Sequence, residues 1–204
     1  AVVNVNLNGP YAHGVWSSSK CEVGNEEALE GRSEAIVSNF VETIRSAYSN
    51  DEIRNMTLVD VGCYDGFLTT EIEKRLPFKK IIGIEPRGKN IKKGETVRKF
   101  LSITTNIDFI ETDLDGLVEG KFFFDIVFCS GVFHHLEDLV ISTKKLRTIV
   151  KQAIYLETQC YPDESNSILG RFLGNLHLRR IEPKDIVYKF LLKTVGIVGT
   201  KFES

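Results

Sequence analysis

The chain has 204 residues, of which 42% are apolar, and its 26 basic and 28 acidic residues give a net charge of −2. This composition is typical of one soluble domain; it argues against a large nucleic-acid-binding surface and, because no apolar run reaches about 18 residues, against a membrane span. The four cysteines lie far apart without a Cys-x-x-Cys pair, which favours a reducing, cytoplasmic location over a disulfide framework or a zinc site.

The first unit of the chain comprises residues 1–32. They are polar, contain glycine and show little periodicity, and they lack the basic and apolar regions of a signal peptide. Tyr11, His13 and Trp16 supply the ring side chains of this stretch. We expect an arm that these rings hold against the rest of the protein, or a partly disordered terminus. The alternative is a lid in which His13 or Trp16 touches substrate.

The second unit, residues 33–204, begins where the sequence becomes periodic. Apolar residues recur at intervals of three and four, which predicts an amphipathic helix over Ser33–Tyr48. A short β-branched run predicts a strand at Thr57–Val61. After a turn bounded by two glycines, helical spacing resumes over Phe67–Leu76 and ends at a proline, which cannot continue a helix.

Further strands and helices alternate along the chain, as expected for a parallel sheet with right-handed crossovers. The ligand crevice of such a sheet lies beyond the carboxyl ends of its strands. The remaining elements are predicted as a strand at Lys80–Ile84, a helix at Asn90–Leu101, strands at Asp108–Glu111 and Phe122–Phe128, a helix at His135–Val150, a strand at Gln152–Glu157, a helix from Glu182 to near Gly196 and a strand at Ile197–Phe202.

The turn after the first strand reads Gly62-Cys63-Tyr64-Asp65-Gly66. Its glycines let the backbone leave the strand and allow a ligand or a helix to approach closely. The spacing matches neither the G-x-G-x-x-G dinucleotide fingerprint nor a Walker phosphate loop. Glu85 lies about 20 residues further on, at the end of the next strand, where a carboxylate can accept hydrogen bonds from the hydroxyls of a ribose.

Four segments in this order resemble the motifs of class I S-adenosylmethionine-dependent methyltransferases: VDVGCYDG, GIEP, ETDL and FDIVFCSGVFHHL. The resemblance spans about Thr57 to Leu139. It implies an α/β, Rossmann-like methyltransferase fold with a mostly parallel twisted sheet, helices on both faces, and S-adenosyl-L-methionine as the cofactor. The family usually has glycine at the position of Tyr64, so the loop is bulkier here. No sequence remains for the family's last antiparallel strand, so either this domain lacks that strand or the sequence is truncated.

The resemblance also implies which residues hold the cofactor. Glu85 would bind the ribose diol, while Asp113 and Leu114 would contact adenine, unless Asp113 only caps the next turn. The glycine turn and the segment after the fourth strand would hold the methionine end, although free cysteines are more often packing residues. The residues assigned to the cofactor are Asp60, Gly62, Cys63, Tyr64, Gly66, Glu85, Pro86, Asp113, Leu114, Cys129, Ser130 and Gly131.

The adjacent pair His134-His135 follows the fourth strand, close to where the methyl group is expected. An oxygen nucleophile benefits from a base near neutral pKa, so one of them, with His135 slightly favoured, is a candidate catalytic base. The alternative is a structural histidine that bonds a backbone group. We expect no metal, because the spacing of the pair to Glu137 and Asp138 is not diagnostic of a metal site.

These observations favour a methyltransferase that acts on an oxygen or nitrogen of a small-molecule or sugar acceptor. A tRNA wobble-uridine methyl or carboxymethyl transferase is the less favoured alternative, since VFCSGVFHHLED also resembles the corresponding motif of such enzymes. A non-catalytic S-adenosylmethionine-binding module and a nicotinamide dehydrogenase complete the alternatives. The sequence gives no signal for an oligomeric state.

Overall fold

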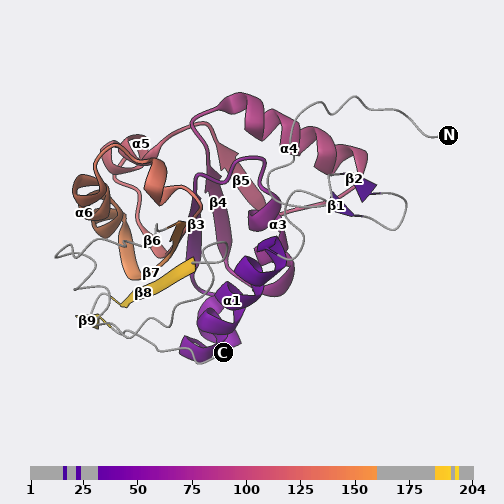
Figure 1. The fold of residues 1–204 in the computed structure, drawn as a ribbon. Coiled ribbons are helices and arrows are strands. Elements are labelled where there is room, and N and C mark those ends of the chain that lie inside the picture. Colours follow the sequence, from indigo (N-terminus) through magenta and orange to yellow (C-terminus); the bar gives the residue numbers. More distant parts are fainter. Residues whose placement is uncertain (1–15, 18–21, 24–31, 160–186, 194–195, 198–204) are drawn as a thin grey trace.

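One sheet forms the centre of the structure, a computed structural model that describes residues 16–17, 22–23, 32–159, 187–193 and 196–197 (Figure 1). Its strands lie in the order β5 (Ile107–Ile110), β4 (Lys80–Ile84), β3 (Thr57–Val61), β6 (Phe124–Ser130), β7 (Val150–Gln159), β8 (Val187–Lys193) and β9 (Gly196–Ile197). The five strands from β5 to β7 are parallel. The chain order reverses between β3 and β6, so the crevice beyond their carboxyl ends is where an open α/β sheet binds its ligand.

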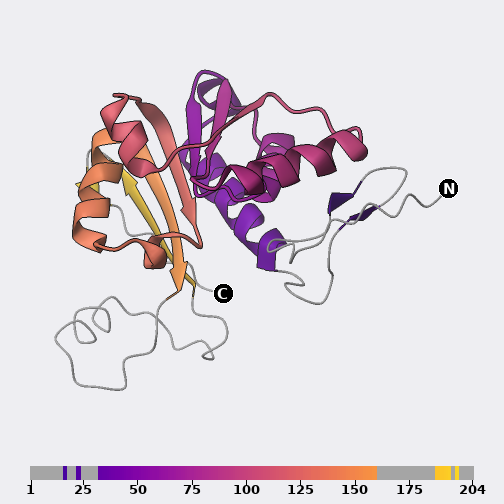
Figure 2. The ribbon, with the colours of Figure 1, turned by 90° about the horizontal axis from the view of Figure 1, so that it is seen from above.

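Helices cover both faces of this sheet (Figure 2). One face carries α1 (Arg32–Ala47), α3 (Phe67–Arg75) and α4 (Gly88–Phe100), and the other carries α5 (Leu114–Glu119) and α6 (Leu139–Ile149). Strand side chains alternate between the faces, so Leu58 joins the first core and Val59 joins the second. Burial on both sides explains why these parallel strands are nearly continuously apolar.

The amphipathic helix predicted before the first strand is α1. Phe40 on its inner face contacts the rings of Phe128 and Tyr155, with centroid distances of 4.8 Å and 5.1 Å. These two residues belong to β6 and β7, so α1 packs across both strands. Its first residue, Arg32, thereby reaches the carboxyl end of β7, where it pairs with Glu157.

The short strands β1 (Trp16–Ser17) and β2 (Glu22–Val23) form a separate antiparallel pair. Trp16 is only 1% exposed and packs edge-on against Phe67, the first residue of α3, at a centroid distance of 5.2 Å. This tryptophan therefore packs against the domain, as expected for a ring that holds the arm. Tyr11 and His13 lie outside the described residues.

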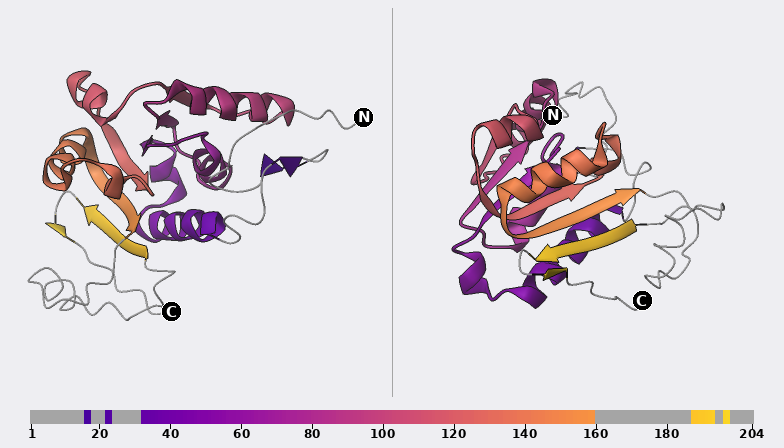
Figure 3. Two further views of the ribbon diagram at one scale, coloured as in Figure 1. Left: turned by 45° about the horizontal axis from the view of Figure 1, so that its top comes forward. Right: turned by 90° about the vertical axis from the view of Figure 1, so that its left-hand side faces the viewer.

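The C-terminal elements differ from the sequence prediction. The stretch expected to be a helix up to Gly196 contains β8, which pairs antiparallel with β7, and β9 pairs antiparallel with β8 (Figure 3). A short apolar run fits a helix or a strand equally well, and the long neighbour β7 decides in favour of a strand. Antiparallel pairing therefore occurs at this edge of the sheet, where the sequence predicted none. Of the strand predicted at Ile197–Phe202, residues 198–204 lie outside the described residues.

Two boundaries near the site also move. The fourth parallel strand begins at Phe124, because Phe122 and Phe123 are 46% and 57% exposed. The helix predicted from His135 starts at Leu139 as α6, because the Asp138 carboxylate accepts hydrogen bonds from the first-turn amides. The two histidines instead lie in a short 3-10 helix, η1 (Phe133–His135).

The one-turn helix α2 (Asn50–Ile53) precedes β3. No helix among the described residues is long and apolar enough to span a bilayer.

Candidate functional site

The turn between β3 and α3 lies over the point where the chain order reverses. Gly62 and Gly66 have φ angles of +76° and +77°, which glycine adopts without strain. A Cβ on Gly62 would lie 2.2 Å from a methyl carbon of Val132, and one on Gly66 would lie 2.4 Å from the ring of Phe109. The two glycines therefore let neighbouring segments approach closely, as the spacing predicted.

The amides of this turn are partly engaged within the protein. The N–H groups of Gly62 and Cys63 both donate to the carbonyl of Ile84 at 2.9 Å, which ties the turn to the end of β4. The Cys63 side chain is buried, and burial raises the pKa of its thiol. Cys63 is thus a packing residue whose N–H is already bonded, and its carbonyl accepts from Gly66 at 2.8 Å.

Tyr64 adopts the conformation that a glycine would take at this position. Its φ angle is +55°, at a cost of about 1–2 kcal/mol for a residue with a Cβ. Its ring is approached by the guanidinium of Arg87 at 5.9 Å and the ammonium of Lys93 at 5.8 Å. The turn therefore keeps a left-handed backbone despite the larger side chain, whose ring contacts residues after β4.

Buried polar groups next to this turn stabilise it. The Asp60 carboxylate in β3 accepts a hydrogen bond from the Thr69 hydroxyl at 2.5 Å, and burial raises its pKa to about 7. The Arg98 guanidinium in α4 donates to the carbonyl of Asp65 at 2.9 Å and stacks 4.0 Å from the centre of the Phe109 ring. The turn is thus held by α3 on one side and α4 on the other.

Glu85 lies directly after β4 and is only 2% exposed. One of its oxygens, Oε1, accepts hydrogen bonds from the Asn90 amide at 3.0 Å and from the side chain and backbone of Arg87 at 2.7 Å and 3.2 Å. Every hydrogen bond that described residues donate to this carboxylate goes to Oε1, so Oε2 is available to a ligand. The neighbouring Pro86 is exposed.

The residues after β5 have local structural roles. The Asp113 side chain accepts from the Gly116 amide at 2.9 Å and caps α5, which is the alternative that the sequence left open. Leu114 is buried in the core with Leu117. Asp113 itself is exposed, whereas the Leu114 side chain packs inside the protein.

The segment after β6 joins this strand to β7. Cys129 is fully buried, and burial raises the pKa of its thiol to about 12. The Ser130 hydroxyl donates a short hydrogen bond to the Glu157 carboxylate, and the Gly131 amide donates to the Glu157 carbonyl at 3.0 Å. Gly131 has a φ of +69°, and a Cβ added there would meet no atom within 4 Å outside its chain neighbours.

The two histidines of η1 have different environments. The Nδ1 atom of His134 lies 3.2 Å from the Thr158 hydroxyl, and burial lowers the pKa of this imidazole. His135 is exposed, and the two ring centroids are 4.0 Å apart. His134 therefore already has a partner on β7, whereas His135 faces solvent.

Sequence reasoning did not single out Glu157 or Arg98. Glu157 is fully buried at the end of β7 and lies 3.6 Å from the Arg32 guanidinium. An acidic residue after an apolar run at the end of a parallel strand is the signal that identified Glu85, so the same signal could have identified Glu157. For Arg98 no such signal exists, because a basic residue in a helix is normally solvated.

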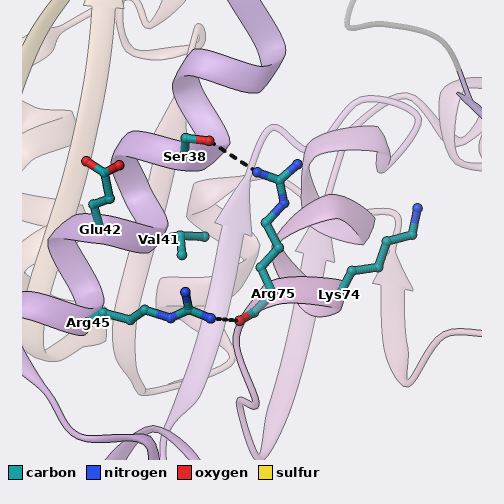
Figure 4. A pocket seen from close by; sticks show the side chains of 6 residues that line it. All are labelled: Ser38, Val41, Glu42, Arg45, Lys74 and Arg75. Carbon is teal, nitrogen blue, oxygen red and sulfur yellow. Dashed lines mark hydrogen bonds between the residues drawn. The ribbon is translucent and has the colours of Figure 1, made fainter.

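An open depression between α1 and α3 is separate from these strand ends. It is lined by Ser38, Val41, Glu42, Arg45, Lys74 and Arg75 (Figure 4). The Arg45 guanidinium donates to the Arg75 carbonyl at 2.9 Å. Lys74 and Arg75 end α3, whereas the glycine turn precedes it, so the depression lies at the other end of the helix.

Comparisons with known proteins show which sequences this chain resembles. A family model described as "Methyltransferase domain" matches residues 59–153. A tRNA U34 carboxymethyltransferase from Campylobacter concisus is 29% identical over 103 residues, which cover 50% of this chain and 35% of the relative. The protein of the same name from Campylobacter jejuni strain 81-176 is 27% identical over 116 residues, covering 56% and 39%. The chain therefore spans less than half the length of these curated relatives.

Solved structures with the same architecture share little sequence. The N-terminal domain of EvdMO1, crystallised in the presence of SAH and D-fucose, aligns with a TM-score of 0.57 and 18% identity over 79% of this chain and 64% of that one. The YcgJ protein from Bacillus subtilis aligns with a TM-score of 0.54 and 16% identity, covering 71% and 58%. At this identity the likeness concerns the fold, and it confirms the predicted Rossmann-like α/β architecture.

Proposed function

Because this chain carries a class I S-adenosylmethionine-dependent methyltransferase domain, we propose that it binds S-adenosylmethionine at the ends of β3, β4 and β5 and transfers the methyl group. The acceptor is an oxygen or nitrogen of a small molecule or sugar. Residues 33–204 form the methyltransferase domain in this proposal, and residues 1–32 form its arm.

The observation that carries the proposal is the state of Glu85. A carboxylate that is 2% exposed is costly to bury unless its oxygens are bonded, and three donors converge on Oε1 alone. The other oxygen can accept hydrogen bonds from the hydroxyls of a ribose, which are neutral donors. The position also fits, because Glu85 follows the strand next to the glycine turn.

The remaining residues are assigned to different parts of the ligand. Gly62 and Gly66 add no side chain at the two ends of the turn, and Asp60 supports it through Thr69. Asp113 would accept from the adenine amino group with the oxygen that does not cap α5. When bound, S-adenosylmethionine supplies a sulfonium-activated methyl group. The chain's own contribution is to align the acceptor with that carbon and to exclude water, since in-line displacement depends above all on alignment. His135, or His134, is the candidate for proton transfer that the sequence predicts.

Isothermal titration calorimetry tests this proposal directly. S-adenosylmethionine and S-adenosylhomocysteine should bind with one-to-one stoichiometry, and NAD should show no heat at the same concentrations. Binding of NAD in place of both sulfur nucleosides would favour the dehydrogenase alternative. Tight binding of S-adenosylmethionine without turnover on any acceptor in a radiolabelled screen would favour a non-catalytic binding module.

A tRNA acceptor is the second candidate, and the similarity to proteins named tRNA U34 carboxymethyltransferase favours it. Filter binding of unmodified tRNA at rising salt concentration tests this candidate. A phosphate-contacting surface should give an affinity that falls steeply with salt, whereas a small-molecule enzyme should show weak binding to any tRNA. A methyl or carboxymethyl group recovered in the wobble nucleoside would decide for tRNA.

A further inference from the structure

The feature with no role so far is the carboxylate of Glu157. This residue is fully buried near the carboxyl end of β7, directly beside Ser130 of β6 in the strand register. The Ser130 hydroxyl donates to Oε2, and the Gly131 amide donates to the backbone carbonyl. Ser130 therefore holds one oxygen of the carboxylate, and Gly131 holds the backbone of the same residue.

The other oxygen, Oε1, is buried and receives no hydrogen bond from the described residues. Among the described residues, the Arg32 guanidinium lies 3.6 Å from this oxygen, which is beyond hydrogen-bond length. The surface ion pair Arg75–Glu34 has a distance of 2.6 Å, so the Arg32–Glu157 pair is the longer of the two. A buried acceptor left without a donor costs about 1–3 kcal/mol, and more when it is charged. Packing alone gives no reason to keep a carboxylate at this position.

Its position gives such a reason. Glu85 directly follows β4 and Glu157 lies near the carboxyl end of β7, and the glycine turn and the Gly131 turn lie between them. Neighbouring strands are about 4.8 Å apart, so β4 and β7 are separated by about 14 Å along this edge. A nucleoside held by Glu85 at one end would therefore direct its other end across β3 and β6 towards Glu157. Gly131 adds no side chain in between.

We propose that Glu157 faces the methyl acceptor and that Oε1 takes the hydrogen of its attacking group. This inference rests on the proposed function. The acceptor oxygen or nitrogen forms a bond to the methyl carbon while the carbon–sulfur bond breaks and its electron pair goes to sulfur. The proton of the acceptor goes to Oε1, so charge and atoms balance. Arg32 offsets part of the carboxylate charge without occupying the oxygen.

The proposal restricts the substrate class. The acceptor must carry O–H or N–H at the methylated atom, as alcohols, phenols and primary or secondary amines do. Acceptors that lack this hydrogen, such as thioethers and tertiary amines, would leave the buried oxygen without a donor. This proposal gives the proton to Glu157 in place of the histidine pair, of which His134 bonds Thr158 through Nδ1 and His135 is exposed.

Binding of two nucleosides tests the assignment without knowledge of the acceptor. One probe is S-adenosylhomocysteine. The other is sinefungin, an analogue in which a carbon bearing a protonated amine replaces the sulfur and its methyl group. The wild-type protein should bind sinefungin at least tenfold more tightly than S-adenosylhomocysteine. Glu157→Gln, which retains an acceptor for Ser130, should reduce this ratio to near one while the affinity for S-adenosylhomocysteine changes less than threefold.

Two further variants keep the test decisive. Arg32→Gln removes the cation that competes with the ligand amine for Oε1, and the Arg32 side chain is 37% exposed. This variant should raise the preference for sinefungin, and it can be measured even if Glu157→Gln does not fold. Glu119→Gln, an exposed acid at the end of α5, should leave the ratio unchanged. An undiminished ratio in folded Glu157→Gln, or an unchanged ratio in Arg32→Gln, overturns the inference while the proposed function stands. Failure of the wild type to bind S-adenosylhomocysteine overturns both.

Discussion

Replacing Gly62 by alanine should destabilise the protein for two separable reasons. A side chain at a φ of +76° costs about 1–2 kcal/mol. The added Cβ would also lie 2.2 Å from a Val132 methyl carbon, and relieving such overpacking costs about 1–3 kcal/mol. Together these terms predict a loss of about 2–5 kcal/mol, a large share of the stability of a domain.

Two variants separate the terms. Gly131→Ala has a nearly equal φ of +69° but no atom within 4 Å of the new Cβ outside its chain neighbours, so it should show the backbone cost alone. Val132→Ala removes the clashing methyl group and leaves its Cβ at 3.1 Å from the new atom. In the Gly62→Ala background this second change should restore about 1–3 kcal/mol, although by itself it removes half-buried methyl groups and should destabilise.

Urea unfolding followed by circular dichroism gives the free energy of unfolding of the wild type, the three single variants and the double variant. An unchanged m-value confirms that folded and unfolded states remain comparable. A Gly62→Ala protein no less stable than Gly131→Ala would refute the close approach of the two turns. So would a double variant whose losses simply add. Either result would leave glycine at the start of the turn without a packing reason.

Three further predictions concern the same edge of the sheet. Glu85→Gln should weaken S-adenosylhomocysteine binding about 10- to 100-fold by calorimetry, because a charged hydrogen bond is worth about 1.5–3 kcal/mol; equal affinity would exclude Glu85 from the site. Gly94→Ala should destabilise the protein in urea, against the usual helical gain of about 1 kcal/mol, because the Cβ would lie 1.8 Å from the Asp65 carbonyl oxygen; a stabilised variant would contradict the packing of α4 on the turn. Burial raises the pKa of Asp60 from 3.8 to about 7, so its favourable contribution to the free energy of unfolding is full below pH 3.8 and is lost as the pH rises through about 7. Asp60→Asn should therefore flatten the decline in stability between pH 4 and pH 7. Stability profiles of the variant and the wild type that fall in parallel would argue against the shift in pKa.

The glycine turn could be predicted because its determinants are local. Gly62 and Gly66 follow a β-branched run and precede helical spacing, and both adopt positive φ as glycine allows. Tyr64 shows the limit of this reasoning. Its size suggested a changed loop, but the backbone stays left-handed at +55° and the ring finds cations after β4. Those cations are remote in sequence, so the sequence alone could not place them.

Elements fixed by distant partners were predicted less well. The apolar residues of β8 suit a helix and a strand alike, and the strand forms because β7 pairs with it along its whole length. Asp113 was expected either at adenine or as a cap of the next turn; its side chain accepts from the Gly116 amide in a short helix that the sequence did not indicate. Glu157 was missed because its unusual state, one oxygen bonded and one bare, exists only beside Ser130 and Arg32.

The charges along the strand ends follow an order that bears on the chemistry. Glu85 and Glu157, at the two sides, each lie beside an arginine, whereas Asp60 in the middle bonds the neutral hydroxyl of Thr69. Burial raises the Asp60 pKa to about 7, so near neutral pH this central carboxyl carries only part of a negative charge. Methyl transfer from a sulfonium removes positive charge at sulfur, and a strongly anionic centre would stabilise the bound cation more than the transition state. In the proposed function, negative charge at the two sides, with a weakly charged group between them, would allow binding of the nucleoside and of the acceptor without that penalty.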